Sequence, residues 1–378
     1  MGHLTMARDE VYRELVERLQ KNPVGVVMNE TLMKILHILY GEKEAAIGSK
    51  FPMLPSTIDK ISQKTGMPEE ELLQHLESMA QKGLVVDIHR KGTTYYWLSP
   101  AVVGWFEYTF MRVNDSLPMK ELAVLFNQYH HEKGVAEEFF GADTKMFHVW
   151  PYESRIPAGV RTEVMTYEKA SEMIKDSGGG SLTMCYCRHQ ARHVGKACDN
   201  PVEDVCTTLG IASEFLIRRG FARPATVDEL LRVLDRTEKL GLVHLADNVQ
   251  NNPAFLCHCC GCCCGVLGSI NKAGVMSVHP SNFIPAVDLN NCAGCGKCAE
   301  RCHVGAIEIM ETVPGDKKSR KARIKNDICI GCGACLSACK KEAIGFVHRK
   351  VLYVPPKNKK EQMMQIAMQR GKIKHFME

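Results

Sequence analysis

Residues 291–302 read NCAGCGKCAERC, and residues 327–339 read DICIGCGACLSAC. Both runs space four cysteines as Cys-x2-Cys-x2-Cys-x3-Cys, and in each run an Ala-Ile pair begins four residues after the last cysteine. The chain therefore contains an internal repeat. Soft thiolates gathered at such short spacings are typical ligands of zinc, copper(I) and iron–sulfur clusters.

The repeat resembles the bacterial ferredoxin module, in which three cysteines of one run and the fourth cysteine of the other run hold each [4Fe–4S] cluster. The resemblance implies two such clusters, with zinc as the alternative. Cluster one would take Cys292, Cys295, Cys298 and Cys339, and cluster two would take Cys329, Cys332, Cys335 and Cys302. Small residues in the turns would let backbone amides approach the cluster sulfurs; they are Gly294, Gly296, Gly331 and Gly333. The family's proline after the fourth cysteine is replaced here by His303 and Lys340, and we expect these residues to affect potential and local geometry.

The length and composition describe a globular chain with room for two or three domains. It has 378 residues, of which 45% are hydrophobic and 24% are charged. It begins MGHLTMARDE, without the apolar segment of a secretory signal, and the longest uncharged stretch, Asn248 to Asn271, is broken by Pro253. We therefore expect a soluble, cytoplasmic protein with no transmembrane segment. In such a reducing compartment, most of the 18 cysteines should be metal ligands rather than disulfides.

Ten further cysteines lie between residues 185 and 264, in two sets. The stretch CYCRHQARHVGKACDNPVEDVC supplies Cys185, Cys187, Cys198 and Cys206, and FLCHCCGCCCG supplies Cys257, Cys259, Cys260, Cys262, Cys263 and Cys264. If the second stretch runs extended, Cys257 and Cys259 face one side, whereas Cys260, Cys262 and Cys264 face the other. Gly261 and Gly265 would leave room where a cluster presses on the backbone. We expect one or two further iron–sulfur clusters here, with zinc or buried free thiols as the alternatives.

Two helices are predicted between these cysteine sets. One should begin at Asn200-Pro201 and end at Gly220, and the other should begin at the capping box Thr226-x-x-Glu229 and end near Gly241. Residues 185–345 resemble a group of iron–sulfur proteins of anaerobic microbes that carry motifs reading here CYCR, GKACDNP and CHCCGCCCG. That resemblance implies electron transfer in anaerobic metabolism. A weaker resemblance joins the last motif to the CCG cysteine motif of heterodisulfide reductase subunits.

The N-terminal third contains no cysteine. STIDKISQKTG and MPEEELLQHLESMAQKGLV predict a helix, a turn and a helix, and LVVDIHRKGTTYYWLSP predicts two strands. This order resembles a winged helix-turn-helix. However, residues 1–115 carry 13 Lys or Arg against 15 Asp or Glu, and the second helix opens with three glutamates from Glu69. Phosphate contacts supply most non-specific DNA affinity, so we expect protein docking or homodimer formation rather than DNA binding.

These observations predict an α+β multidomain chain. Its parts would be a winged-helix-like domain (1–115), a connecting helical segment (116–180), a helical cysteine-rich domain (181–284), a dicluster ferredoxin domain (285–350) and a basic C-terminal tail (351–378). Six Lys or Arg among residues 317–325 form either a solvated hairpin or a docking patch for an acidic redox partner.

The function predicted is electron transfer. The chain would pass single electrons to or from a partner oxidoreductase, as an independent protein or as a subunit of a larger complex. No Rossmann fingerprint or Walker A loop is found, so no flavin, nicotinamide or ATP site is expected. We expect an electron-transfer subunit without an independent catalytic site, and a catalytic iron–sulfur enzyme is a less favoured interpretation. The alternative is a transcription regulator in which the state of a cluster controls the winged helix.

Overall fold

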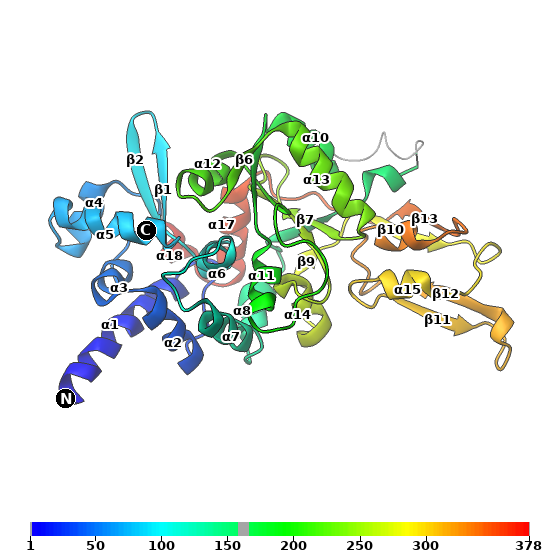
Figure 1. The fold of residues 1–378 in the computed structure, drawn as a ribbon, viewed down its shortest axis with the longest axis horizontal. Helices are drawn as coiled ribbons and strands as arrows, with labels where there is room; N and C mark the ends of the chain where they lie inside the picture. Colours follow the sequence, from blue (N-terminus) through cyan, green and yellow to red (C-terminus); the bar gives the residue numbers. More distant parts are fainter. Residues whose placement is uncertain (1, 158–165, 378) are drawn as a thin grey trace.

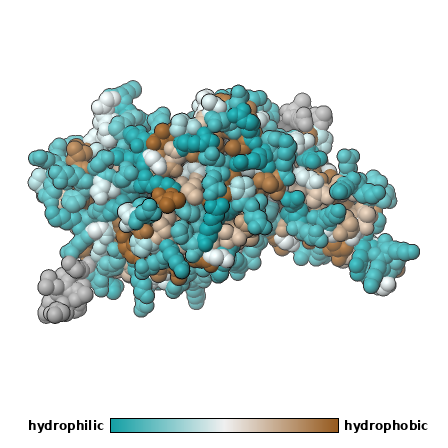
Figure 2. All heavy atoms as spheres, viewed as in Figure 1, coloured by the Kyte–Doolittle hydropathy of each residue, from teal (hydrophilic) through white to brown (hydrophobic). Residues whose placement is uncertain are grey.

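The computed structural model describes residues 2–157 and 166–377. Figure 1 shows an elongated molecule with the N-terminal helices at one end, a central sheet covered by helices, and a small module of short helices and hairpins at the other end. Helices and strands are mixed in several domains, as expected for an α+β chain. The face seen in Figure 2 is largely hydrophilic, with small hydrophobic patches scattered among the hydrophilic residues. Among the described helices, none is long and apolar enough to cross a membrane.

The N-terminal region contains the predicted helix, turn, helix and hairpin. Its elements are α1 (Gly2–Gln20), α2 (Glu30–Leu39), α3 (Glu42–Ser49), α4 (Ile58–Thr65), α5 (Glu69–Gln81), β1 (Val85–Arg90) and β2 (Thr93–Leu98). Leu72 and Leu76 of α5 are fully buried in the same core as Leu36 of α2. The strands pair antiparallel from Val85↔Leu98 to Arg90↔Thr93. The helical periodicity of the apolar residues and the alternation in the hairpin therefore predicted local structure correctly.

A short helical layer connects this region to the centre of the molecule. It comprises a turn at Ala101–Trp105 followed by α6 (Phe106–Phe110), α7 (Met119–His130) and α8 (Val135–Phe140). Aromatic rings hold the layer together, since Phe106 packs at 4.5 Å from Phe126 and at 5.7 Å from Phe139 between ring centroids. Edge-to-face arrangements of this kind add to the burial of the rings.

The central region is a seven-stranded sheet, whereas the sequence predicted a helical domain. The strand order is β6-β4-β5-β8-β7-β3-β9, and every pair is antiparallel except β3 with β9. The strands are β3 (Phe147–Trp150), β4 (Gly180–Thr183), β5 (Cys206–Leu209), β6 (Arg223–Ala225), β7 (Val243–Asp247), β8 (Phe255–Cys259) and β9 (Val278–His279). They are short, and β3, β5 and β7 are buried along their whole length, so the period-two alternation of a half-exposed strand is absent. The segment expected to connect the domains contributes β3 to this sheet.

Helices cover both faces of the sheet. α10 (Ala170–Asp176) and α13 (Val227–Lys239) pack on one face through Ile174, Leu230 and Val233. The remaining helices of this region are α11 (Tyr186–His193), α12 (Gly210–Arg218) and α14 (Gly265–Ala273). α13 has the predicted capping box, in which Thr226 and Glu229 bond reciprocally.

The helix predicted to begin at Asn200 begins instead at Gly210. Residues 201–205 form a loop with Asp204 at φ 50°, and Cys206 then starts strand β5. Thr183↔Cys206 pairing with β4 and Thr207↔Leu256 pairing with β8 place this segment in the middle of the sheet. Sheet pairing therefore overrides the helical signal of Asn-Pro at this position.

The module at the far end consists of two two-stranded antiparallel sheets and two short helices. The elements are β10 (Phe283–Val287), α15 (Lys297–Arg301), β11 (Ile307–Glu311), β12 (Arg320–Ile324), α16 (Ala334–Ala338) and β13 (Ile344–His348). β10 pairs with β13 and β11 pairs with β12, in both cases antiparallel. In each half of the cysteine repeat, one short helix follows the cysteine-containing turn: α15 in the first half and α16 in the second.

The C-terminal segment is packed into the fold, whereas the sequence predicted a basic tail. α17 (Lys359–Gln369) lies behind the central sheet in Figure 1, and α18 (Ile373–Met377) follows it. Gln362 is fully buried and donates hydrogen bonds of 3.1 Å to the carbonyl oxygens of Lys145 and Met146. Ile366 and Ala367 are also buried, so this helix is part of the core although it follows the ferredoxin-like module in the sequence.

Candidate metal centres

The first predicted ferredoxin ligand set surrounds a cavity of about 240 Å³. Cys292, Cys295, Cys298 and Cys339 all line it, and Cys295 is exposed. Gly294 has φ 61°, and a Cβ atom there would lie 2.2 Å from the carbonyl oxygen of Arg320. Only glycine tolerates both the left-handed backbone and this close approach. The residues present therefore fit a [4Fe–4S] cluster at the outer end of the molecule.

The second predicted set lies deeper in the module. Burial raises the pKa of Cys332 to about 12, and the neighbouring thiolates of Cys302 and Cys329 act in the same direction. The pKa of Cys335 is also raised, first by burial and then by Cys332, Cys329 and Cys302. These mutual effects place Cys302 with the three cysteines of the other run. Thiols whose pKa is raised by burial, as for Cys329, Cys332 and Cys335, lose their protons readily only to a metal, because the metal replaces the solvation that burial removes.

The residues on either side of Cys302 contact the central domain. The Nδ1 atom of His303 accepts a 3.0 Å hydrogen bond from the Gly261 amide, and its Nε2 atom lies 2.7 Å from the Gly241 carbonyl oxygen. The Asn271 amide group donates to the backbone carbonyl of His303 at 2.9 Å. Arg301 donates to the Leu240 carbonyl oxygen at 2.7 Å. His303, which was expected to affect potential and local geometry, also connects the second cluster set to the cysteine-rich turn.

The ten remaining cysteines separate into a group of four and a group of six. The first group contains Cys198, Cys260, Cys262 and Cys263, whose sulfurs all lie within 4.8 Å of one another. Cys198 comes from the loop after α11, and the other three come from the turn after β8. Cys260 is buried, whereas Cys262 is exposed.

The six other thiols form a closed ring in which each interacts with two neighbours. In order around the ring they are Cys185, Cys187, Cys264, Cys259, Cys257 and Cys206. They line one largely apolar cavity between β5, β8, α6 and the starts of α11 and α14. The contact with its neighbours Cys187 and Cys206 holds the pKa of Cys185 well below its ordinary value. The six thiols around this cavity exceed the four that saturate one cubane.

A buried cation lies between the two groups. Arg188 on α11 is fully buried and donates 2.8 Å and 2.7 Å hydrogen bonds to the carbonyl oxygens of Pro201 and His258. Thiolates of Cys185 and Cys260, one from each group, raise its pKa against the opposing effect of burial. Arg188 can therefore balance part of the negative charge of metal–thiolate centres on both sides. Arg192, four residues later, is instead exposed and pairs with Glu203.

The predicted alternation along FLCHCCGCCCG holds only to the end of β8. The strand ends at Cys259, and residues 261–263 form a turn before α14 begins at Gly265. Cys264 therefore joins Cys257 and Cys259 in the ring, whereas it was expected to share a side with Cys260 and Cys262. Gly261 is small for a different reason than expected, since a Cβ atom there would lie 2.4 Å from the carbonyl oxygen of His303.

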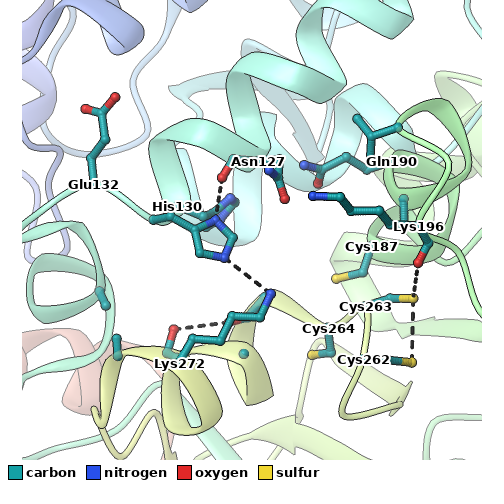
Figure 3. A pocket seen from close by; sticks show the side chains of 18 of the residues that line it. Asn127, His130, Glu132, Cys187, Gln190, Lys196, Cys262, Cys263, Cys264 and Lys272 are labelled. Carbon is teal, nitrogen blue, oxygen red and sulfur yellow. Dashed lines mark hydrogen bonds between the residues drawn. The ribbon is translucent and has the colours of Figure 1, made fainter.

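A cavity of about 560 Å³ opens beside both groups (Figure 3). Cys262 and Cys263 of the four-thiol group and Cys187 and Cys264 of the ring line one side of it. Its other lining residues include His130, Gln190, Lys196 and Lys272. No sequence pattern predicts this cavity, because its lining combines residues of α7, α8, α11 and α14.

One comparison with known proteins bears on these centres. Residues 291–343 match the family model of a 4Fe-4S dicluster domain. The match spans both cysteine repeats, so the predicted dicluster domain near the C-terminus is confirmed. No curated protein matches the chain. The cysteines between residues 185 and 264 lie outside the matched range.

Proposed function

We propose that this protein transfers single electrons through iron–sulfur clusters to or from a partner oxidoreductase in anaerobic metabolism, either alone or as a subunit of a larger cytoplasmic complex. The observation that carries the proposal is the contact between His303 and Gly261. His303 directly follows a predicted ligand of cluster two, and Gly261 lies between two cysteines of the four-thiol group. A dicluster domain joined in this way to a second thiol-rich region has the arrangement of a relay rather than of an isolated carrier.

The positions of the proposed centres imply the order in which electrons would pass through them. Cluster one would lie at the outer end, where Cys295 is exposed and Lys297, Lys340 and Lys341 surround the cavity. Cluster two would lie inside it, where Tyr152 of the central domain donates its amide to the Cys332 carbonyl oxygen at 3.1 Å. The ring of six thiols lies deeper still, in the largely apolar cavity described above. An external donor or acceptor would therefore meet cluster one first.

The basic hairpin of residues 317–325 is a weaker candidate for docking an acidic redox partner than the rim of the cluster-one cavity, where Lys340 and Lys341 lie. In the hairpin, Arg320 pairs with Glu311, and Lys325 pairs with Glu308 at 3.3 Å. These pairs neutralise part of the charge that would steer an acidic partner. Lys340 and Lys341, by contrast, are exposed beside the exposed ligand Cys295. We place the redox partner at this rim.

The proposal is tested on the full chain purified without oxygen. Iron and acid-labile sulfide should correspond to at least two [4Fe–4S] clusters, and dithionite reduction should give electron paramagnetic resonance signals of interacting clusters. The control is the same protein after exposure to air, which should lose both signal and iron. A protein that contains stoichiometric zinc and almost no iron would contradict the proposal.

A redox-sensing regulator is the second candidate, and one contact favours it. Asp87 in β1 is buried and bonds to Arg219 (3.0 Å) and Arg218 (2.9 Å) at the end of α12, which follows the strand carrying Cys206. A change at the ring could therefore reach the hairpin of the winged-helix-like region. However, Glu77 of α5 forms an ion pair with Arg219, and the first turn of α5 is acidic. These features favour α5 as part of a protein interface over insertion into DNA.

A further inference from the structure

We propose that Cys198, Cys260, Cys262 and Cys263 bind one Zn²⁺ ion in a tetrahedral site, separate from every iron–sulfur cluster of the chain. This inference goes beyond electron transfer and does not depend on it. Sequence spacing alone left zinc and iron–sulfur clusters open for all ten cysteines of this region. The positions of the sulfur atoms distinguish the two.

Distances between the sulfurs carry the assignment. Zinc–thiolate bonds are about 2.3 Å long, so two corners of a regular ZnS₄ tetrahedron are about 3.8 Å apart. The Sγ atoms of Cys198 and Cys260 are 3.7 Å apart, those of Cys198 and Cys263 are 3.8 Å apart, and those of Cys262 and Cys263 are 3.7 Å apart. All four lie within 4.8 Å of one another. The group therefore has the dimensions of a single-ion site.

An iron–sulfur cubane does not fit this group. In a cubane each thiolate binds a different iron, so the four thiolates are held apart by the whole core of iron and sulfide. Among the side chains that the structure describes, those of residues 9–157 and 167–375, no other group of three or more cysteine, histidine or carboxylate ligands gathers its ligand atoms this closely. The eight ferredoxin cysteines and the six ring cysteines are all in that range. The difference in spacing separates one compact site from the centres that would hold clusters.

Surrounding groups offset part of the −2 charge of a zinc tetrathiolate. The Asn200 side-chain amide lies 3.3 Å from the Cys198 sulfur and can donate to it. The guanidinium of Arg188 lies on the Cys260 side, where its Nε atom is buried with no hydrogen-bond partner of oxygen or nitrogen. Donors and cations around the thiolates stabilise such a site and orient its ligands. No open coordination position is left, which is typical of structural rather than catalytic zinc.

The zinc ion would link two segments that have no regular secondary structure. Cys198 belongs to a loop without regular structure after α11, and the other three ligands belong to the turn between β8 and α14. Zinc would fix this turn, including Gly261, on which His303 docks. Cys262 is exposed and lines the large cavity with Cys263 (Figure 3), so a chelator can reach the ion from that side.

The test uses the full-length protein expressed with both metals available and purified without oxygen. Elemental analysis should give one zinc per chain in addition to iron. Cys198→Ser and Cys262→Ser should each remove that zinc and leave the iron content unchanged. The matched controls are Cys259→Ser in the ring and Cys295→Ala in cluster one, which should lower iron and keep zinc.

A second measurement covers variants that fail to fold. Zinc K-edge X-ray absorption of the unmodified protein should show four sulfur neighbours at about 2.3 Å. Loss of iron in Cys198→Ser, a protein without zinc, or a zinc shell containing oxygen or nitrogen would overturn the proposal. One tetrahedral iron at this site would overturn it as well. A protein with the ZnS₄ site but without iron would contradict the proposed function and leave this inference intact.

Discussion

Replacing His303 with alanine should loosen the dicluster domain from the central domain without removing a cluster. The variant loses two hydrogen bonds, from the Gly261 amide to Nδ1 and from Nε2 to the Gly241 carbonyl oxygen. It keeps the bond from Asn271 to the backbone carbonyl of residue 303. Because Cys302 and its neighbours are unchanged, the iron content should equal that of the unmodified protein.

The size of the effect follows from these two bonds. A typical hydrogen bond contributes about 1 kcal/mol net, so their loss should cost about 2 kcal/mol. His303 is only half-buried, and water can partly replace its contacts, which makes this an upper value. Since every 1.4 kcal/mol is a factor of ten, the equilibrium between the open and closed arrangement should shift roughly 10- to 30-fold.

Hydrogen exchange measures this shift directly. The Gly261 amide and its neighbours in residues 260–264 should exchange up to about 30-fold faster in His303→Ala than in the unmodified protein. Lys340→Ala is the matched control, because Lys340 occupies the corresponding position after the last cysteine of the other run and is exposed. Equal exchange in all three proteins, with iron unchanged, would refute the reasoning that His303 holds the two domains together.

Three further predictions test the ligand sets, the contact of Asp87 and the absence of DNA binding. Cys295→Ala and Cys332→Ala should each remove one [4Fe–4S] cluster, and an unchanged iron content in either variant would refute the assigned ligand sets. Asp87→Asn should reduce the free energy of unfolding by about 1–3 kcal/mol in a denaturant titration, because it removes one of the two carboxylates that pair with Arg219 and leaves only Glu77. Although burial alone raises the pKa of Asp87, hydrogen bonds from Arg219 and His89 outweigh it and lower that pKa below 3.8. The stabilisation by this carboxylate is thus complete above about pH 4 and is lost as the pH falls through the lowered pKa; a pH-independent difference between variant and parent down to pH 2 would contradict it. The full chain should not retard duplex DNA in a gel-shift titration at low salt, and sequence-selective, salt-sensitive binding would instead favour the regulator.

Features encoded over short distances could be predicted from the sequence. The turns of the dicluster repeat need glycine and cysteine at fixed spacing, so the pattern itself specifies the module that the family match confirms. The capping box at Thr226 and Glu229 is equally local, and the helix begins there. In both cases the signal lies within a few residues of the structure that it produces.

Features that depend on contacts between distant segments could not be predicted. Cys198 meets Cys260 across 62 residues, and Cys206 joins the ring because β5 pairs with both β4 and β8. No local pattern encodes this pairing, and the buried strands carry no alternation. The sequence of residues 351–378 predicts a basic tail that could carry a terminal helix, and the buried face of α17 consists of only a few residues, among them Gln362. A fragment ending at Asn282 would lack this helix, so the thiol centres are best studied in the full chain.

The two thiol groups of the central domain then have different tasks. Zinc is a d¹⁰ ion without redox chemistry, so a zinc site at Cys198 and the turn after β8 would not conduct electrons. It would instead hold the surface on which His303 docks, because Gly261 lies between two of its ligands. Under the proposed function, the ring, which shares Arg188 with the zinc site and has six thiols around an apolar cavity, would be the centre that exchanges electrons with cluster two. A fixed docking surface matters for that exchange, since a relay works only while the distance between its centres is maintained.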